Sequence, residues 1–508
     1  MEGLREIWET DVLVIGGGLA GMLAAIEAEG EGVSVSLFTR GKAGLSGSSV
    51  ISQTMLLVFE GKESEREIFL SEIYEAGGRL NEPNLLEKLI DEGSHAVKKL
   101  QSYGVPLSAG KISPNGSRFY RIVKGRSKDL TSPLRKIVLS KDIFLMEGFD
   151  FIGFVKGADG EVGGGLFFKN GELFLVKAKA TVLASGGFAR VYAYSDNSIH
   201  TTGESLIFAL DAGARLMDLE FVQFYPYWLV KPVWLGIYAS LFFHGAKLRN
   251  ENGEYFLNKY PKAELETRDI LAREIFLQNK VFLDLSGLSD ETIRELNPLL
   301  FRILKKYGRD NLEVKPVAHF TMGGIMIDER CFTGVPGLFA CGECVGGVHG
   351  ANRVGGMALT ECAVFGPIAG REASLYAKEA DFAILNFDYV GFPKGGEDTL
   401  VDIERRLGYI AWEYGGIVRS GEGLVKGLEE LYHLKEAFDR RNPSDLGRWL
   451  RLKAIFELME LLLKASLERR ESRGAHYRSD YPCASDSWHK HICFKKEMEK
   501  VSMDLKGA

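Results

Sequence analysis

Residues 319–359 read HFTMGGIMIDERCFTGVPGLFACGECVGGVHGANRVGGMAL. This stretch predicts a short apolar strand over 337–341, an acid at Glu343, and a glycine-rich loop that leads into a helix over 357–370. These parts suit an anionic, polyhydroxylated cofactor, because backbone N–H groups face phosphate while the acid accepts from hydroxyls. A generic surface loop would leave Glu343, His319 and Arg353 unexplained. The stretch therefore predicts a cofactor site, with substrate chemistry close to it.

Length and composition limit the class of protein. A chain of 508 residues with 45% hydrophobic residues can bury two or three cores. Its formal net charge of −6 does not suggest a nucleic-acid partner. The start MEGLREIWET predicts a strand and no signal peptide, and the longest apolar run, 233–243, is too short to span a bilayer.

The six cysteines favour a reducing compartment. We therefore expect a cytoplasmic protein, attached to a membrane only through partner subunits if at all. The cysteine spacing does not match an iron–sulfur site, and we predict no metal site in this chain. If the protein transfers electrons, an organic cofactor does so, and any metal relay belongs to another chain.

A second cofactor motif lies near the N-terminus. The apolar, β-branched run at 11–15 is typical of a buried parallel strand, and it leads into GGGLAG at 16–21, a G-x-G-x-x-G pattern. Its first glycine makes the turn, its second lets backbone approach a pyrophosphate, and its third lets helix pack on strand. The next strand, 33–38, ends at Thr39-Arg40 and lacks the acid of a nicotinamide site. The pattern therefore favours FAD.

Two further stretches approach the same cofactor. The segment GLSGSSVISQ at 44–53 offers backbone and serine donors for a phosphate or an isoalloxazine edge, with a plain loop as the alternative. The strand TVLASGG at 181–187 ends in glycines. Glu204 follows in the first turn of a predicted helix, where a carboxylate is favoured whether or not it contacts cofactor.

The remaining pattern predicts an α/β fold with insertions. Residues 143–180 predict a β-meander, and 223–318 shift toward aromatic and charged residues, which is typical of an inserted domain. The apolar spacing from 400 is helical, whereas the tail after 471 is polar and irregular. We divide the chain into a first FAD-domain part (1–222), a capping domain (223–318), a second FAD-domain part (319–385), a linker (386–399), a helical domain (400–471) and a tail (472–508).

Taken in order, these stretches resemble the succinate dehydrogenase/fumarate reductase flavoprotein family, which includes L-aspartate oxidase. The likeness covers nearly the whole chain and is carried by 16–21, 46–53, 183–187, 202–204, 223–226, 267–273, 319–324, 342–343, 347–356 and 471–482. The resemblance implies a Rossmann-like FAD-binding domain interrupted by an α+β capping domain that closes over a dicarboxylate. A C-terminal helical domain follows.

The resemblance also implies residue roles. Arg268 matches the arginine that donates a proton, and His319 and Arg353 match groups that bind substrate carboxylates. Without this likeness, a surface salt bridge would be the usual fate of Arg268. The implied cofactor contacts are Gly16, Gly17, Gly18, Gly21, Thr39, Arg40, Ser48, Ser49, Gln53, Ala184, Gly186, Glu204, Glu343, Ala358 and Leu359.

The chain departs from the family at several positions. Ser48 replaces the histidine that attaches flavin covalently, so we expect noncovalent FAD. Tyr225 and Tyr227 replace the His and Thr of the family's QFHPT motif, and Tyr238-Ala239 replaces a Thr-Glu pair that touches dicarboxylate. About half of the implied substrate contacts remain, which puts succinate and fumarate themselves in question.

Three functional hypotheses follow. The first is an FAD-dependent oxidoreductase that exchanges hydride between flavin N5 and a carbon–carbon bond next to a carboxylate, with electrons shared with a separate iron–sulfur subunit. The second is L-aspartate oxidase. The third is an FAD electron-transfer subunit without dicarboxylate turnover, which the changes at Tyr225 and Tyr238-Ala239 motivate. Cys341 and Cys344 are interpreted as small packing residues, with a redox-active dithiol as the alternative.

Overall fold

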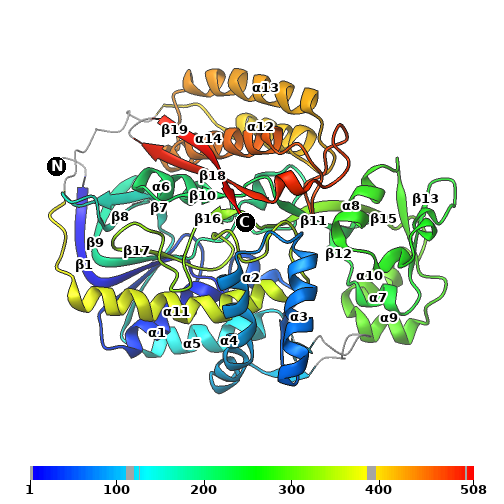
Figure 1. The fold of residues 1–508 in the computed structure, drawn as a ribbon, viewed down its shortest axis with the longest axis horizontal. Helices are drawn as coiled ribbons and strands as arrows, with labels where there is room; N and C mark the ends of the chain where they lie inside the picture. Colours follow the sequence, from blue (N-terminus) through cyan, green and yellow to red (C-terminus); the bar gives the residue numbers. More distant parts are fainter. Residues whose placement is uncertain (1–3, 110–118, 125, 386–395, 498–499) are drawn as a thin grey trace.

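A mainly parallel sheet brings the predicted cofactor strands side by side (Figure 1). β1, β2, β6, β9 and β17 run parallel, and β7 and β8 are antiparallel additions. The meander predicted over 143–180 forms the β7–β8–β9 part. In spatial order the sheet contains β6 (Ile143–Glu147), β2 (Val35–Thr39), β1 (Leu4–Ile15), β9 (Glu172–Leu183), β8 (Val162–Lys169) and β7 (Asp150–Lys156), with β17 (Leu338–Ala340) paired to β9.

The computed structural model describes residues 4–109, 119–124, 126–385, 396–497 and 500–508. Most of the predicted linker, residues 386–395, therefore lies outside the described residues. Among the described residues, no helix combines the length and the apolar character needed to cross a bilayer.

Two helices meet closely beside the central sheet. α1 (Leu19–Gly30) packs against α11 (Met357–Glu379), which continues well past the helix predicted over 357–370. A Cβ added at Gly370 would lie 2.2 Å from the backbone oxygen of Ala24, so this crossing requires glycine. α5 (Lys128–Ser140) also contacts α1. The close crossing sets the position of the α1 N-terminus over the carboxyl ends of the strands.

The inserted segment forms a separate antiparallel sheet with its own core. Figure 1 shows this capping region in green, to one side of the central sheet. Its strands are β12 (Leu235–Gly236), β11 (Val222–Lys231), β15 (Glu313–Thr321), β14 (Val281–Asp284) and β13 (Lys247–Asn250). Its helices are α7 (Ser240–Phe243), α8 (Arg268–Phe276), α9 (Asp290–Leu296) and α10 (Pro298–Tyr307). β11 begins the insertion and β15 ends it, and these two strands pair antiparallel with each other.

Smaller elements complete the half of the molecule that contains the central sheet. β3 (Met55–Val58), β5 (Phe119–Val123) and β4 (Leu107–Ala109) form a three-stranded sheet. α2 (Ser48–Ile51) lies in the serine-rich loop, and α6 (Glu204–Ala212) begins at the predicted acid. α3 (Glu63–Ala76) and α4 (Pro83–Ser102) are the two amphipathic helices of this region.

The C-terminal part is a helical layer followed by a β-hairpin. α12 (Val401–Tyr414), α13 (Gly421–Asp439) and α14 (Leu446–Glu468) pack together, as the helical spacing predicts. The prediction of an irregular tail holds for most of 471–489 but is wrong for the residues that follow. β18 (Lys490–Glu497) and β19 (Lys500–Gly507) form a sheet with β10 (Leu216–Met217) and β16 (Gly324–Ile325). The two tail strands pair with each other along their length, and β18 also pairs with β10.

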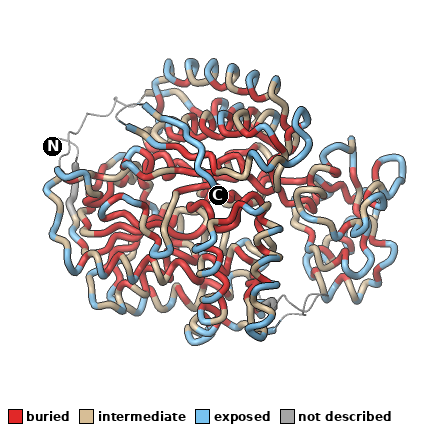
Figure 2. The backbone as a smooth tube through the Cα atoms, in the orientation of Figure 1, coloured by how far each residue is buried: buried red, intermediate tan, exposed pale blue. Residues whose placement is uncertain are grey.

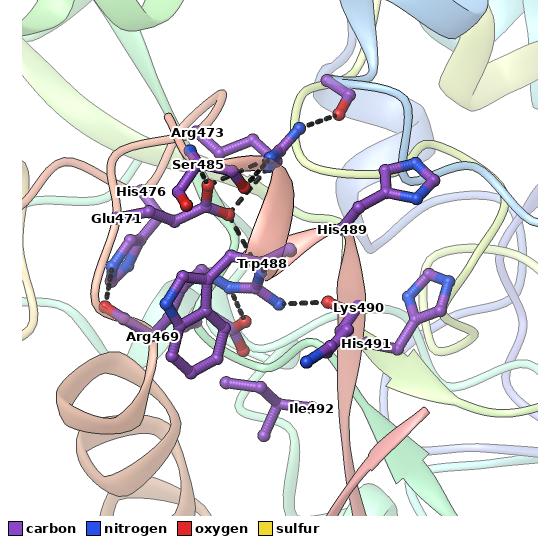
Figure 3. A network of polar contacts seen from close by, with 12 residues as sticks. Arg469, Glu471, Arg473, His476, Ser485, Trp488, His489, Lys490, His491 and Ile492 are labelled. Atoms are coloured by element: carbon purple, nitrogen blue, oxygen red, sulfur yellow. Dashed lines mark hydrogen bonds and ion pairs between the residues drawn. The ribbon is translucent and has the colours of Figure 1, made fainter. Parts of the chain in front are cut away.

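Burial separates the layers clearly. In Figure 2 the central strands and the interior of the helical layer are buried, while the outward side of α13 and the outer loops of the capping region are exposed. Figure 3 shows the polar network around Arg469 in the C-terminal segment, in which Arg469, Glu471 and His491 are buried. Arg469 is fully buried and pairs with Glu220 at 2.6 Å and Glu471 at 3.2 Å. This cluster fastens the C-terminal segment behind the site described next.

Candidate active site

A cavity opens at the carboxyl ends of β1, β2 and β9, where ligands of such sheets bind. Most of the predicted cofactor residues line it: Gly16, Gly17, Gly18, Thr39, Arg40, Ser48, Ser49, Ala184, Gly186, Glu204 and Glu343. Gly21, Gln53, Ala358 and Leu359 are not among its lining residues. Leu359 packs in the main core, and Ala358 packs against a small cluster around Phe320.

The glycine motif shapes one end of the cavity. Gly16 has φ +119°, and a Cβ there would lie 2.2 Å from the Ala184 backbone oxygen. A Cβ at Gly21 would lie 1.9 Å from the Gly16 oxygen, so Gly21 allows the helix to pack on the turn. A Cβ added at Gly18 would have Ser49 Oγ, 3.6 Å away, as its nearest neighbouring atom. The N-terminus of α1, with no acid in its first turn, therefore opens onto the cavity and suits a pyrophosphate.

A buried ion-pair cluster occupies the end of β2. Arg40 pairs with Glu204 and, at 2.5 Å, with Asp150, and Thr202 Oγ1 donates to Glu204 at 2.6 Å. Burial alone would raise the pKa of Glu204, but Arg40 lowers it, so the carboxylate stays ionised. The charge of Arg40 is thus already balanced, and the Glu204 carboxylate, which lines the cavity, remains as an acceptor for ribose hydroxyls. Sequence reasoning missed Asp150, which no local pattern marks.

Glu343 lies at another part of the cavity wall, next to the glycine-rich end of β9. Its Oε1 accepts from the Thr321 backbone N–H at 3.2 Å. Burial raises the pKa of Glu343 to about 8. A Cβ at Gly187 would lie 2.5 Å from this carboxyl oxygen, so the glycine leaves room for the acid. A neutral buried carboxyl in this place can both donate to and accept from a polyhydroxylated chain.

The two site arginines meet at one neutral oxygen. Arg268 Nη1 donates to Gln223 Oε1 at 2.9 Å, and Arg353 Nη2 donates to the same oxygen at 2.8 Å. Among the described residues, neither guanidinium forms an ion pair with a carboxylate. Burial, and then the charge of Arg268, lower the pKa of Arg353 to about 9. This arrangement leaves positive charge available for an anion.

Gln223 itself is held by a second amide. Its Nε2 donates to Asn352 Oδ1 at 2.8 Å and to the Arg353 carbonyl at 2.7 Å. Asn352 Nδ2 then donates to Asp269 Oδ1 at 3.0 Å. Sequence reasoning quoted Gln223 as part of a motif and assigned no role to it, to Asn352 or to Asp269. Only the hydrogen bonds of the folded chain show that Gln223, Asn352 and Asp269 belong to the site.

His319 lies in the same group of residues. Its Nδ1 is 2.6 Å from Asp196 Oδ2, and Asn197 Nδ2 donates to its carbonyl at 2.6 Å. Burial lowers the pKa of His319, and the charges of Arg268 and Arg353 act in the same direction, while Asp196 opposes them. The imidazole ring is 5.2 Å from the ring of Tyr225. The structure therefore brings Arg268, His319 and Arg353 together.

The cysteines near the cavity are free thiols. Cys341 and Cys344 are buried, and Cys344 Sγ donates to the Leu183 and Cys341 carbonyls at 3.3 Å. Burial raises the pKa of Cys344 to about 12 and that of Cys341 well above its usual range. Protonated thiols are poor nucleophiles, which supports the packing interpretation over a redox dithiol.

Comparison with known proteins places this geometry in context. The family described as "FAD binding domain" matches residues 11–359, and "Fumarate reductase flavoprotein C-term" matches residues 404–507. A fumarate reductase (CoM/CoB) subunit of Methanothermobacter marburgensis is 31% identical over 97% of this chain and 98% of that protein. The L-aspartate oxidase of Pyrococcus abyssi is 32% identical over 93% of this chain and 96% of that protein.

A solved structure agrees with these matches. A variant of the E. coli quinol fumarate reductase FrdA aligns with a TM-score of 0.89 at 25% identity, over 99% of this chain and 97% of that chain. The similarity therefore extends through the central sheet, the inserted region and the C-terminal helices together.

Proposed function

Because this chain belongs to the flavoprotein family of the fumarate reductases, succinate dehydrogenases and L-aspartate oxidases, we propose that it exchanges hydride with a carbon–carbon bond next to a carboxylate. The family match confirms the predicted fold class and the FAD cofactor, and the protein is an FAD-dependent oxidoreductase. Its substrate, residue roles and electron partner are proposals.

One observation carries the choice of a carboxylate. Two guanidinium groups share the single neutral oxygen of Gln223, without a paired carboxylate among the described residues. An anion that enters this site gains charge-assisted hydrogen bonds, and a carboxylate matches the planar donors of arginine. A neutral substrate would leave both charges uncompensated.

We assign a separate role to each of the site residues. We assign Arg353 and His319 to the substrate carboxylate and Arg268 to the proton that one alkene carbon receives. Gly18, Thr39, Arg40, Glu204 and Glu343 would hold FAD, which supplies a hydride when bound. Asp196, through its contact with His319 Nδ1, orients the imidazole toward substrate.

An anaerobic assay tests this proposal. Flavin-loaded protein should oxidise reduced viologen when an unsaturated carboxylate is added, and Arg268→Gln should lower kcat by at least about 10³-fold, the scale of a lost proton donor. Carboxylate binding should change much less. Equal turnover by wild type and R268Q would contradict the assigned role.

L-aspartate oxidase is the second candidate, because the Pyrococcus abyssi enzyme of that name is 32% identical to this chain. An aerobic peroxide assay with L-aspartate separates the two. The third hypothesis, an electron-transfer subunit, is favoured if the protein binds flavin but shows no turnover in either assay, and if no added carboxylate changes the flavin spectrum.

The proposed electron partner is an iron–sulfur protein subunit. The support is the likeness to the Methanothermobacter marburgensis protein, which is named as one subunit of a fumarate reductase, and to FrdA. Any membrane attachment would come through such partners. Affinity purification from the native cell under anaerobic conditions should recover a chain with cysteine clusters, and recovery of this chain alone would count against the proposal.

We also propose noncovalent FAD. The Ser48 hydroxyl lines the cavity and donates to Asn197 Oδ1 at 3.0 Å, and a hydroxyl is a poor attachment point for flavin. Acid precipitation should release all of the flavin into the supernatant. Yellow colour that stays with the precipitate would contradict this.

A further inference from the structure

Tyr225 is buried in the middle of the proposed substrate site. Its side chain is 2% exposed, its hydroxyl donates to the Ile237 carbonyl at 2.6 Å, and it accepts from Gln53 Nε2 at 2.8 Å. A phenol has one O–H donor, and here that donor is used within the protein. The hydroxyl is therefore not available as a donor to a substrate carboxylate.

The ring of Tyr225, and not its hydroxyl, contacts the site residues. The Arg268 guanidinium carbon is 5.2 Å from the ring centroid, and the His319 ring is 5.2 Å away at 42°. Tyr225 thus fills the space between the proton donor and the imidazole with an aromatic surface.

The cations of the site lie together. The charges that act on His319 are those of Asp196, Arg268 and Arg353. On the side of Tyr227, whose ring is 5.9 Å from that of Tyr225, the charges are Glu264 and Arg268. Arg268 and Arg353 share one acceptor, so they form a single cationic centre. Among the residues that the structure describes, these contacts provide for one carboxylate and supply no separate cation for a second.

The surroundings of Tyr225 are aromatic instead. Trp228 lies 6.4 Å from Tyr225, and Trp234, which is 49% exposed, lies 5.7 Å from Trp228. Tyr238 is 40% exposed and is a further electrostatic neighbour of the Tyr225 hydroxyl. Such rings favour apolar or aromatic groups over a second carboxylate, whose desolvation would go uncompensated.

Building on the proposed function, we infer that the substrate is an enoate with one carboxylate and an uncharged, apolar or aromatic substituent, and that Tyr225 determines this specificity. Reduction converts R–CH=CH–COO⁻ to R–CH₂–CH₂–COO⁻. Bound reduced FAD would supply the hydride to one carbon and would itself be oxidised, Arg268 would give the other carbon a proton, and water would reprotonate Arg268. The saturated acid is the substrate in the opposite direction.

The test compares carboxylates on flavin-loaded full-length protein. Calorimetry measures the binding of butyrate and 3-phenylpropanoate beside succinate, and a reduced-viologen assay measures turnover of crotonate and cinnamate beside fumarate. We expect at least about tenfold tighter binding and higher kcat/KM for the better monocarboxylate, because unpaired charge is rejected strongly. Tighter binding of succinate than of both monocarboxylates would overturn the inference, even if fumarate is reduced.

Variants locate the cause. Tyr225→His restores a ring donor and should shift the preference toward succinate and fumarate by about tenfold or more. Tyr225→Phe removes only the internally bonded hydroxyl and should keep the monocarboxylate preference, as should Tyr255→Phe, a capping-region control whose hydroxyl bonds Asp284. A loss of the preference in Y225F would overturn the role of the ring.

Two results separate this inference from the proposed function. No turnover of any enoate by flavin-loaded protein would overturn the proposed function, and calorimetry would still show which carboxylates the site accepts. If Y225H fails to bind flavin, the wild-type comparison of succinate with butyrate and 3-phenylpropanoate decides the substrate class, and Y225F decides the role of the Tyr225 ring.

Discussion

At the scale of single residues, Gln223 sets the geometry of the two site arginines. Its side chain has no solvent exposure, both of its N–H groups are bonded, and its one oxygen accepts from both guanidiniums. The two guanidiniums and the Arg353 carbonyl fix which way the Gln223 amide points, because a reversed amide would place its N–H groups against theirs and its oxygen against the carbonyl. Asp269, next to Arg268 on α8, anchors Asn352. The chain of amides therefore joins the capping region to the FAD-binding half.

Gln223→Glu should weaken catalysis strongly. The new carboxylate would pair with Arg268 and Arg353 and compete with the substrate carboxylate, so KM should rise at least about tenfold and kcat/KM should fall about 10²-fold, about 2.7 kcal/mol. Steady-state kinetics with the best substrate measures both. Gln278→Glu, in the same capping region, is the control and should leave KM unchanged. An unchanged KM in Q223E would show that the arginines do not bind the carboxylate.

At the scale of elements, the start of α1 separates structural from cofactor-binding glycines. Gly16 has positive φ and no room for a Cβ, whereas Gly18 has φ −76° and open space toward the cavity. In this motif, the backbone conformation requires a glycine at position 16, and the proposed ligand requires one at position 18.

Two alanine variants test this difference. Gly16→Ala should destabilise the flavin-free protein by roughly 2 kcal/mol or more, because the turn must change. Gly18→Ala should leave that stability within about 0.5 kcal/mol and lower flavin affinity at least about tenfold. Chemical denaturation and flavin titration measure the two quantities. If G18A bound flavin as wild type does, the assigned position of the pyrophosphate would be wrong.

At the scale of the whole molecule, the buried charges of Figure 3 fasten the C-terminal segment to the FAD-binding half. Arg469 pairs with Glu220 and Glu471, and its guanidinium lies 4.7 Å from the ring centroid of Phe221. Phe221 in turn belongs to the small apolar cluster that contains Phe320, over which Arg353 lies at 4.5 Å. The cluster thus supports the substrate site from behind.

Arg469→Leu should destabilise the protein by roughly 3–5 kcal/mol, because buried Glu220 would lose its ion pair and Glu471 would keep only Arg473. Arg448→Leu, near the start of the helix α14 that Arg469 follows, removes a partly exposed pair with Glu404 and should cost no more than about 1 kcal/mol. Urea unfolding of the two variants gives the comparison. If both variants lost a similar free energy of unfolding, the buried cluster would contribute no more stability than a partly exposed ion pair.

His491 makes part of this stability depend on pH. Burial alone would lower its pKa, but Asp218 at 2.5 Å, together with Glu82, raises it above 6.5, while Lys506 opposes the rise. Because the folded-state pKa is the higher one, protonated His491 stabilises the protein fully below pH 6.5. The contribution is lost as pH rises through the folded-state pKa. Melting temperatures from pH 6 upward should fall more steeply for wild type than for His491→Gln, and parallel curves would contradict this.

Local patterns predicted the cofactor half more fully than the substrate half. The glycines at 16–21 and 184–187 and the acids Glu204 and Glu343 follow strands or begin helices, so their chain neighbours reveal their place. Asp150 begins an antiparallel strand far along the chain from Arg40, and no neighbouring residue marks it. The tail hairpin escaped prediction because its many charged residues look like a polar tail, although its two strands are neighbours in the sequence and pair with each other.

The sequence by itself determined the family, the α/β fold and the FAD cofactor, because glycine turns, buried strands and helix starts are encoded by residues next to one another. Only the tertiary structure showed which polar groups of the proposed substrate site are already bonded. Gln223 and Arg353 lie 130 positions apart, and Gln53 and Tyr225 lie 172 apart. Folding decides which side chains lie beside an arginine or a tyrosine. These neighbours determine whether the arginine is paired with a carboxylate and whether the tyrosine hydroxyl is already hydrogen-bonded within the protein.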